Sequence, residues 1–270
     1  MPASSSDRAA LGVTTSRGIT AARRAYARAR AERWGATYVE REELTLEEVL
    51  DGFDAILVFE RARVRLVDRL SDLAFHPGMA YRRIQRLSGG GTDPLIDAGR
   101  IARGQRVLDA TLGLGQDALV AAAAVGRTGA VTGLEASRVL AAFVGEGLPT
   151  CALPPGTDPD IADVIRVHHT EAIEWLTGTD ERFDVALLDP MFSRPKPAEP
   201  SFGVLRRYAL PTPLSDDLVA AALARATTVV AKLADSSALT SLSTAPDSVR
   251  RSAAAVYVTF TGPRARKPAV

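Results

Sequence analysis

The segment at residues 107–117 combines residue types that can build a ligand site. A short apolar run leads into Asp109 and then into a turn that contains Gly113 and Gly115, after which a helix is predicted. Glycines in such a turn let the backbone approach a ligand closely at the carboxyl edge of a parallel sheet. The pattern therefore predicts a site for a nucleotide-like ligand.

The turn alone leaves two classes of cofactor open, because the glycine spacing also satisfies the loose dinucleotide pattern of NAD-dependent oxidoreductases. Asp109 favours S-adenosylmethionine, since an anion at the end of the strand would attract a sulfonium or amino group and repel a pyrophosphate. Glu135 closes the apolar run 131–134 and is placed to accept hydrogen bonds from ribose hydroxyls. Both cofactors offer that contact.

A second apolar run, residues 184–188, ends in Asp189-Pro190-Met191-Phe192 and resembles the Asp-Pro-Pro-Tyr/Phe motif of amino-group methyltransferases. An exocyclic amine is a poor nucleophile because its lone pair is delocalised into the ring. The Asp189 carboxylate and the Pro190 carbonyl are placed to accept hydrogen bonds from its N–H groups. Phe192 would stack on the base, a contact worth ~1 to 3 kcal/mol, and hold the nitrogen in line with the methyl group.

The elements that must position these motifs follow an alternating pattern from Gln105 onward, which is typical of βαβ units. Strands are predicted at 105–109, 131–135, 164–168, 184–188, 227–233 and 255–261, and helices at 117–125 and 215–226. We expect a Rossmann-like, mostly parallel, seven-stranded sheet with helices on both faces and an antiparallel strand near 255–261.

The residues before this region predict a small N-terminal α/β accessory domain over 1–75. It would hold a helix at 19–34, an extended run at 36–39 and an apolar strand at 55–59. A second helix would begin after Thr45, with Glu48 completing a capping box. Glycines at 78 and 89–91 are expected to break regular structure, so that 76–104 links the accessory domain to a catalytic domain over 105–270.

Composition narrows the class of protein further. Hydrophobic residues at 46%, charged residues at 24% and a net charge of +1 are ordinary globular values. Cys151 is the single cysteine, which excludes an intrachain disulfide and a cysteine-cluster metal site. No run approaches the ~20 apolar residues of a membrane span. We expect a cytoplasmic protein without a metal or a membrane partner.

Arginines are concentrated in one stretch. Between Tyr81 and Arg106 the chain has six arginines against two acids, a footprint suited to nucleic-acid phosphates. The candidates for RNA contact are the arginines beside the glycine triplet and the cations after the second motif: Arg82, Arg83, Arg86, Arg194 and Lys196.

In this order, the string at 79–83, the glycine triplet at 89–91 and the motifs at 107–117 and 188–192 resemble the RsmJ family. Its members methylate guanine N2 in small-subunit ribosomal RNA, and the similarity covers roughly residues 75–195. The resemblance implies S-adenosyl-L-methionine as cofactor, S-adenosyl-L-homocysteine as product, and RNA or a ribosomal particle as partner. Cofactor contacts carried over from the family fall on Gln116, Asp117, Glu135, Ala136, Glu171, Ala172 and Asp189, beside Asp109, Gly113 and Gly115.

The chain departs from the family at two cofactor positions. Gln116 stands where the family pattern has arginine, and Glu171-Ala172 replaces a small hydroxyl pair, which leaves the adenine-side contacts open. A DNA base, a protein amide or a small amine could also meet the second motif. Two further classes stay open, an NAD-dependent oxidoreductase and an RNA-binding assembly protein without catalysis.

Overall fold

The structure, a computed structural model, describes residues 9–190, 200–210, 212–253 and 255–262. The chain forms two compact units. Unit 1 comprises Met1–His76, Ala136–Ala152 and Lys196–Leu210, and unit 2 comprises Pro77–Glu135, Leu153–Pro195 and Pro211–Val270. Neither unit is one continuous stretch of sequence, because the chain passes between them several times.

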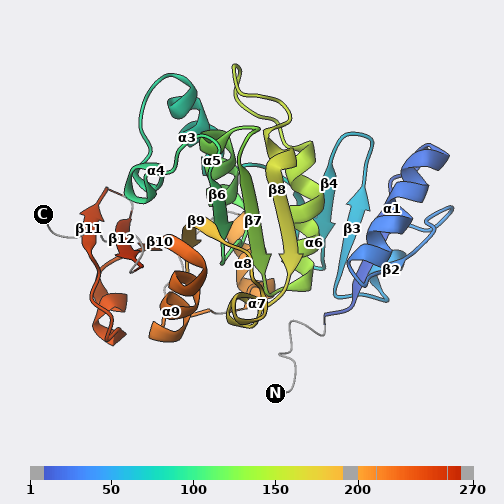
Figure 1. Ribbon diagram of the computed structural model, residues 1–270. Coiled ribbons are helices and arrows are strands. Elements are labelled where there is room, and N and C mark those ends of the chain that lie inside the picture. The colour runs from blue at the N-terminus through green and yellow to red at the C-terminus, as the bar shows by residue number, and fades with distance from the viewer. Residues whose placement is uncertain (1–8, 191–199, 211, 254, 263–270) are drawn as a thin grey trace, which may run out of the picture. The chain divides into compact units, whose positions relative to one another are not determined.

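Unit 2 is built on a sheet whose strands are β6 (Arg106–Asp109), β7 (Ala130–Glu135), β8 (Ile165–His169), β9 (Phe183–Leu188), β10 (Ala226–Leu233), β11 (Ser248–Arg251) and β12 (Val256–Thr261). The seven strands lie in the order β11-β12-β10-β9-β6-β7-β8 (Figure 1). β8, β7, β6, β9 and β10 are mutually parallel, and β12 is antiparallel to both of its neighbours. This confirms the predicted Rossmann-like sheet.

The six strands predicted for this unit agree with the observed strands to within one residue at each end. The prediction missed β11, an edge strand whose side chains are all exposed. Its sequence, SVRR, has no alternation between apolar and polar residues, which is the pattern that identifies a half-buried strand.

Five α-helices are described in unit 2: α3 (Met79–Ser88), α4 (Pro94–Gly99), α5 (Gln116–Val125), α7 (Ala172–Gly178) and α9 (Asp216–Arg225). α7 packs against α9, α3 packs against α5, and α4 packs on β10 and β12. Val229 and Ala231 of β10 belong to the core shared with α7 and α9. Val230 between them faces the other side of the sheet, as the period of a strand requires. Helices therefore cover both faces.

The helix α3 corrects one expectation from the sequence. Glycines were expected to break regular structure between 75 and 92, but residues 79–88 are helical. The glycines flank the helix instead: Gly78 precedes it with a φ of 57°, and Gly89 follows its last residue. Ala80 and Ile84 give the helix a buried face, which stabilises it despite its glycine-rich ends.

Unit 1 contains a five-stranded sheet in the order β2-β1-β3-β4-β5. Its strands are β1 (Leu11–Thr15), β2 (Thr37–Tyr38), β3 (Ala55–Phe59), β4 (Val64–Val67) and β5 (Asp72–Ala74), and its α-helices are α1 (Ala21–Arg33), α2 (Leu46–Leu50), α6 (Arg138–Gly147) and α8 (Pro200–Tyr208). The predicted capping box is present, since Glu48 N–H donates to Thr45 Oγ1 at 3.2 Å and Thr45 N–H to Glu48 Oε2 at 2.7 Å. β1 was not predicted, because all five of its residues are buried and the run lacks alternation.

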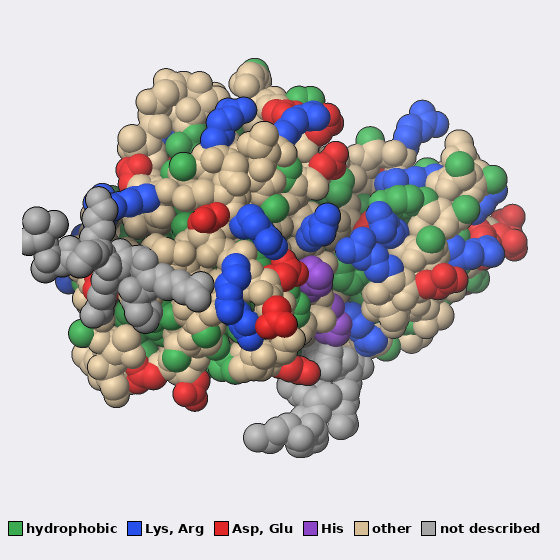
Figure 2. Space-filling model, in the orientation of Figure 1, with side chains coloured by type: hydrophobic (Ala, Val, Ile, Leu, Met, Phe, Trp, Pro, Cys, Tyr) green, Lys and Arg blue, Asp and Glu red, His purple; other side chains and the backbone are tan. Residues whose placement is uncertain are grey.

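Charged side chains of both signs are interspersed on the face shown in Figure 2. On this face, an RNA-binding role must therefore be argued from particular arginines rather than from one large basic surface. Among the residues that the structure describes, no helix has the length and apolarity that crossing a membrane requires.

Candidate functional site

The edge of the unit 2 sheet where β6 and β9 end is the place to look for a ligand. The chain leaves β6 for β7 and β8 on one side and then returns to β9 on the other, so the strand order reverses between β6 and β9. Ligands of such sheets bind outside the carboxyl ends of the strands at this reversal. Asp109 ends β6, and Asp189 directly follows β9.

The turn between β6 and α5 has the backbone that its glycines predict. Gly113 has a φ of 52° and Gly115 a φ of 71°, and residues other than glycine rarely adopt such positive values. The Gly113 N–H donates to Glu135 Oε2 at 2.9 Å, so the last residue of β7 holds the turn. Gly113, Gly115 and Glu135, all predicted from the sequence, therefore meet around one turn.

Asp109 is buried beneath this turn, with 2% of the residue exposed. Its Oδ1 accepts the Thr111 N–H at 3.3 Å. Burial, followed by the charge of Asp117, raises the pKa of Asp109 to about 8. The carboxyl is therefore mostly protonated at neutral pH, and the sequence-based expectation of an anion at this position does not hold for this structure.

We expect Asp109→Asn to stabilise the protein increasingly as pH rises. In the unfolded chain Asp109 ionises near its ordinary pKa of 3.8, whereas in the folded chain its pKa is about 8. Between these values folding must take up a proton, so the wild type loses stability as pH rises and the asparagine variant does not. The free energy of unfolding of each protein can be measured by thermal melting. The advantage of the variant over the wild type should grow by about 2 kcal/mol or more from pH 5 to pH 8, since one unit of pKa shift corresponds to about 1.4 kcal/mol. A difference independent of pH would contradict the protonated carboxyl.

Asp189 lies directly after β9, and only one of its two carboxylate oxygens accepts a hydrogen bond from the described residues. Its backbone N–H donates to Thr111 Oγ1 at 2.6 Å, and its Oδ2 accepts from Lys232 Nζ. Its Oδ1 is buried and has no hydrogen-bond partner in the described part of the chain. Burial raises the pKa of Asp189 to about 6 against the lowering effect of Lys232, which leaves it mostly ionised at neutral pH. A buried carboxylate oxygen without a donor is costly unless a ligand supplies one.

A chain of alternating charges leads to Asp189. Arg83 of α3 donates to both carboxylate oxygens of Asp93, at 2.8 and 2.9 Å, and also to Asp117 Oδ1. Lys232 of β10 donates to Asp117 Oδ2 at 2.5 Å as well as to Asp189. Burial opposes ionisation of Asp117, but Lys232 and Arg83 outweigh it and lower the pKa of Asp117 to about 2.

The sequence-based interpretation missed Lys232, Asp93 and Thr111. Lys232 had a detectable signal, because the chain has 33 basic residues of which three are lysines, and this one interrupts the apolar strand ATTVVAKL. Asp93 precedes a proline-started helix and caps it through the Leu95 N–H at 3.0 Å, which is how an N-terminal capping aspartate is recognised. Thr111 carries no such signal.

The predicted cofactor residues beyond the turn have other partners. Gln116 Oε1 accepts the Met79 N–H at 3.1 Å at the start of α3. The Glu171 side chain caps α7, accepting from the Ile173 N–H at 2.9 Å. Ala172 is buried in the core, and Ala136 follows Glu135 where the chain enters unit 1.

The predicted RNA-contacting arginines of α3 differ in their surroundings. The Arg83 side chain is 16% exposed and donates to two aspartates, so it organises the interior of unit 2. Arg82 and Arg86 are exposed and lie one helical turn apart. The remaining predicted residues, Phe192, Arg194 and Lys196, lie outside the described residues.

No group of three or more histidine, cysteine, aspartate or glutamate side chains suited to a metal ion occurs in the described ranges. The residues at the β6 and β9 ends instead suit an organic ligand that carries both charges. Backbone N–H groups at the glycine turn and the N-terminus of α5 favour a carboxylate. The Asp189 carboxylate, which is mostly ionised at neutral pH, favours a cationic centre, and Glu135 can accept hydrogen bonds from ribose hydroxyls, so the site fits S-adenosylmethionine.

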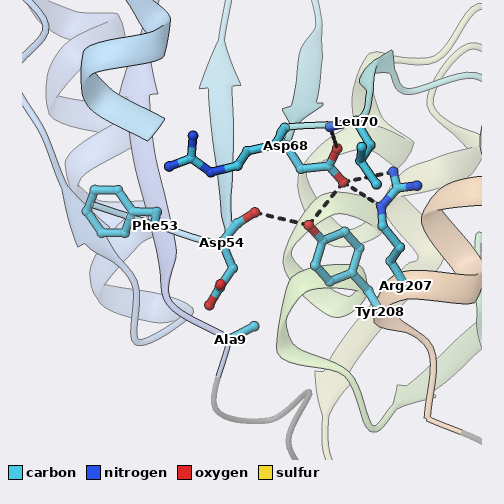
Figure 3. Close-up of a pocket in the computed structure, with 8 residues that line it drawn as sticks. Ala9, Phe53, Asp54, Asp68, Leu70, Arg207 and Tyr208 are labelled. Atoms are coloured by element: carbon cyan, nitrogen blue, oxygen red, sulfur yellow. Dashed lines mark hydrogen bonds and ion pairs between the residues drawn. The ribbon is translucent and has the colours of Figure 1, made fainter. Parts of the chain in front are cut away.

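A cavity of about 440 Å³ in unit 1 is a different feature (Figure 3). Arg207 Nε donates to Asp68 Oδ2 at 2.8 Å, and Tyr208 Oη lies 3.0 Å from the same oxygen. Leu70 N–H donates to Asp68 Oδ1 at 2.8 Å. The buried carboxylate is thus well paired, which is typical of an interaction that anchors α8 to the turn between β4 and β5.

Comparison with known proteins identifies the family. Residues 42–241 match the family described as "Putative SAM-dependent methyltransferase". The chain is 31% identical over 175 residues to the uncharacterized protein YpiP of Bacillus subtilis, an alignment that covers 64% of this chain and 68% of that protein. It is 40% identical over 116 residues to ribosomal RNA small subunit methyltransferase J of Aeromonas hydrophila, covering 42% of this chain and 45% of that protein. The chain thus spans less than half the length of this second relative.

The fold has a counterpart among solved structures. The SAM-dependent methyltransferase NGO1261 from Neisseria gonorrhoeae superposes with a TM-score of 0.63 at 22% sequence identity, covering 93% of this chain and 96% of that one. This likeness shows the fold, and the family match decides between the two classes of cofactor that the glycine turn left open. The chain is similar to RsmJ methyltransferases, and it belongs to the family of SAM-dependent methyltransferases, whose cofactor is S-adenosylmethionine.

Proposed function

We propose that this enzyme methylates the exocyclic amine of a base in RNA, with guanine N2 of small-subunit ribosomal RNA as the favoured target. The names of relatives such as the Aeromonas hydrophila enzyme support RNA as the substrate class. The resemblance in residues 75–195 supports guanine N2. A ribosomal RNA or an assembly particle would place the enzyme in the cytoplasm, and unit 2 would carry the chemistry with unit 1 as an accessory domain.

The observation that carries the proposal is the Oδ1 of Asp189, which has no hydrogen-bond partner among the residues that the structure describes. S-adenosylmethionine, when bound, supplies a methyl group on an electrophilic sulfonium. The target amine would donate an N–H to Asp189 Oδ1 and a second one to the Pro190 carbonyl, which returns electron density to nitrogen. Methylation would convert the primary amine into a secondary amine, with S-adenosylmethionine as the methyl source, and the displaced proton would pass from the N–H group to Asp189 Oδ1 and then to solvent.

Most of the rate acceleration would come from orientation. Two acceptors at one strand end fix the nitrogen in position, and a bound geometry of this kind replaces a collision in solution. Phe192 is proposed to stack on the target base, and Arg194 and Lys196 to contact the flanking phosphates. A base within a helix must be unpaired before it can enter the site, so an accessible loop or an assembly intermediate is the favoured substrate.

Arg82 and Arg86 are proposed to contact RNA phosphates from the exposed side of α3. We expect Arg82→Ala/Arg86→Ala to weaken RNA binding and to reduce the slope of log affinity against log salt by about one to two, since each phosphate contact with a single strand contributes about 0.7. Filter binding at several salt concentrations measures this slope. Binding of S-adenosylhomocysteine should not change.

Arg166→Ala/Arg182→Ala is the matched control for this experiment, because it removes two exposed arginines of the same unit at other places. An equal loss of RNA affinity in both double variants would mean that only the net charge of the unit matters.

The substrate class itself is tested by offering labelled S-adenosylmethionine with purified RNA, DNA, protein and small amines. We expect label in RNA, and mass spectrometry of the digested RNA should locate it on guanine N2. Label in DNA, protein or a small amine instead would contradict RNA as the substrate and would identify the labelled molecule as the methyl acceptor. Cofactor binding without transfer to any of them, particles from ribosome assembly included, would indicate a non-catalytic binding protein.

A further inference from the structure

Lys232 is a charged residue placed in the interior strand β10 beside the catalytic motif. The parallel register of β9 and β10 pairs Leu188 with Ala231, so the next residues along the two strands, Asp189 and Lys232, lie opposite one another. Lys232 Nζ donates to Asp189 Oδ2 and, at 2.5 Å, to Asp117 Oδ2. Its side chain is 22% exposed.

The contact divides the two oxygens of the Asp189 carboxylate between different tasks. Oδ2 is occupied by the lysine, while Oδ1 is buried without a partner among the described residues. A carboxylate attached by a single rotatable bond to its Cβ would otherwise expose either oxygen. A donor at one oxygen fixes the rotation and therefore the direction of the other.

We propose that Lys232 is a positioning residue for methyl transfer, which holds Asp189 Oδ2 so that Oδ1 faces the target amine. The proposal rests on the function proposed for Asp189. Lys232 itself need not touch the substrate, and its second bond, to Asp117, ties the strand end to the first turn of α5.

The charge of Lys232 also favours the ionised form of Asp189. Burial is the largest influence on the pKa of Asp189 and raises it, while Lys232 and Arg83 lower it and Asp117 raises it. The ionised form matters because a protonated carboxyl accepts hydrogen bonds poorly at the oxygen that carries the proton. The other titratable groups around this pair are Asp109 at the end of β6, Asp93 on Arg83, and Tyr257, which pairs in register with Lys232 on β12.

Lys232→Met tests both effects, because methionine keeps a similar length without the charge. With the wild type, kcat/KM should rise with pH through the pKa of Asp189, about 6. Removing an adjacent opposite charge typically raises a carboxyl pKa by about 1 to 3 units. The acid limb, meaning the rising part of the plot of kcat/KM against pH, should therefore move to higher pH by that amount in the variant. The variant should recover a larger share of the wild-type rate at pH 9 than at pH 6.

Lys232→Arg keeps the charge and serves as the matched variant. Its acid limb should stay near that of the wild type even if the larger guanidinium lowers the rate. Lys232→Cys in a Cys151→Ala background offers a second route, since alkylation of the new thiol with 2-bromoethylamine forms an S–C bond, releases bromide and restores an ammonium group. Once the ammonium group is restored, the acid limb should return to its position in the wild type.

A measurement that needs no activity separates this inference from the proposed function. Aspartate labelled with ¹³C at the carboxyl carbon allows each carboxyl to be titrated by NMR, and the resonance of Asp189 is the one lost in Asp189→Asn. Its pKa should rise in Lys232→Met and stay near the wild-type value in Lys232→Arg. An unchanged pKa and an unchanged acid limb in Lys232→Met would overturn the role of Lys232. Failure of the wild type to methylate RNA would overturn the proposed function instead, and the NMR titration would then decide on Lys232 alone.

Discussion

Asp189→Ala is expected to lower kcat for methyl transfer to RNA by about 100-fold to 1,000-fold, the effect of removing one polar group that stabilises a transition state. The variant loses Oδ1, which lies buried at the end of β9 without a hydrogen-bond partner in the described ranges of the chain. Asp189→Asn keeps the size and one acceptor oxygen but loses the charge, so its rate should fall between those of Asp189→Ala and the wild type. Single-turnover methylation with saturating cofactor measures the step directly.

Asp184→Asn is the matched control for this prediction. Asp184 lies at the opposite end of the same strand, where its Oδ2 accepts the Arg106 N–H at 2.8 Å, a bond that asparagine can keep. This variant should methylate RNA at the wild-type rate. Binding of S-adenosylhomocysteine by Asp189→Ala shows whether the site remains folded, and wild-type turnover by that variant would remove Asp189 from the mechanism.

Asp117→Ala should be the most destabilising of the substitutions considered. Asp117 is 7% exposed and accepts from Arg83 and Lys232, so its removal leaves two partly buried cations with one carboxylate fewer. Breaking a buried ion pair from one side costs about 3 to 5 kcal/mol. We expect the lower end, about 3 kcal/mol, because Arg83 keeps Asp93 and Lys232 keeps Asp189. For a chain of this size that corresponds to a fall in Tm of roughly 6 to 12 °C.

Asp217→Ala provides the comparison that isolates the network. Asp217 is the second residue of α9, as Asp117 is of α5, but it is exposed. The substitution therefore removes the same favourable interaction with a helix N-terminus, worth about 0.3 to 1 kcal/mol, without taking a carboxylate away from a partly buried cation. Equal losses of stability in the two variants, measured by thermal or urea denaturation, would mean that the ion pairs of Asp117 contribute nothing net.

The chemistry of the strand ends was accessible from the sequence for a local reason. Asp109, the glycine turn and Glu135 each stand at a fixed distance from an apolar run, and the parallel sheet brings the ends of such runs to one edge. The same reasoning brought the Asp189-Pro190 motif to that edge. Sequence periodicity carries this information because strand burial and turn conformation are local properties.

Other features depended on contacts between distant residues. The raised pKa of Asp109 follows from its burial, and the burial of this side chain cannot be read from the sequence. The sequence led us to expect that Arg83 contacts phosphate. A cluster of arginines has the same sequence whether its members face solvent or pair with a buried acid, so the sequence could not separate the two cases. Only the packing of α3 on α5 shows that Arg83 reaches Asp117.

By itself the sequence determined six strands of the unit 2 sheet, the two motifs at the strand ends and, through its resemblance, the class of cofactor. The tertiary structure decided which polar groups are paired: it placed Lys232 opposite Asp189 and left one oxygen of that carboxylate without a donor from the described part of the chain. The physical reason is that a motif is a property of neighbouring residues, whereas the ionisation and direction of a buried carboxylate depend on whichever charges the fold brings within a few ångströms.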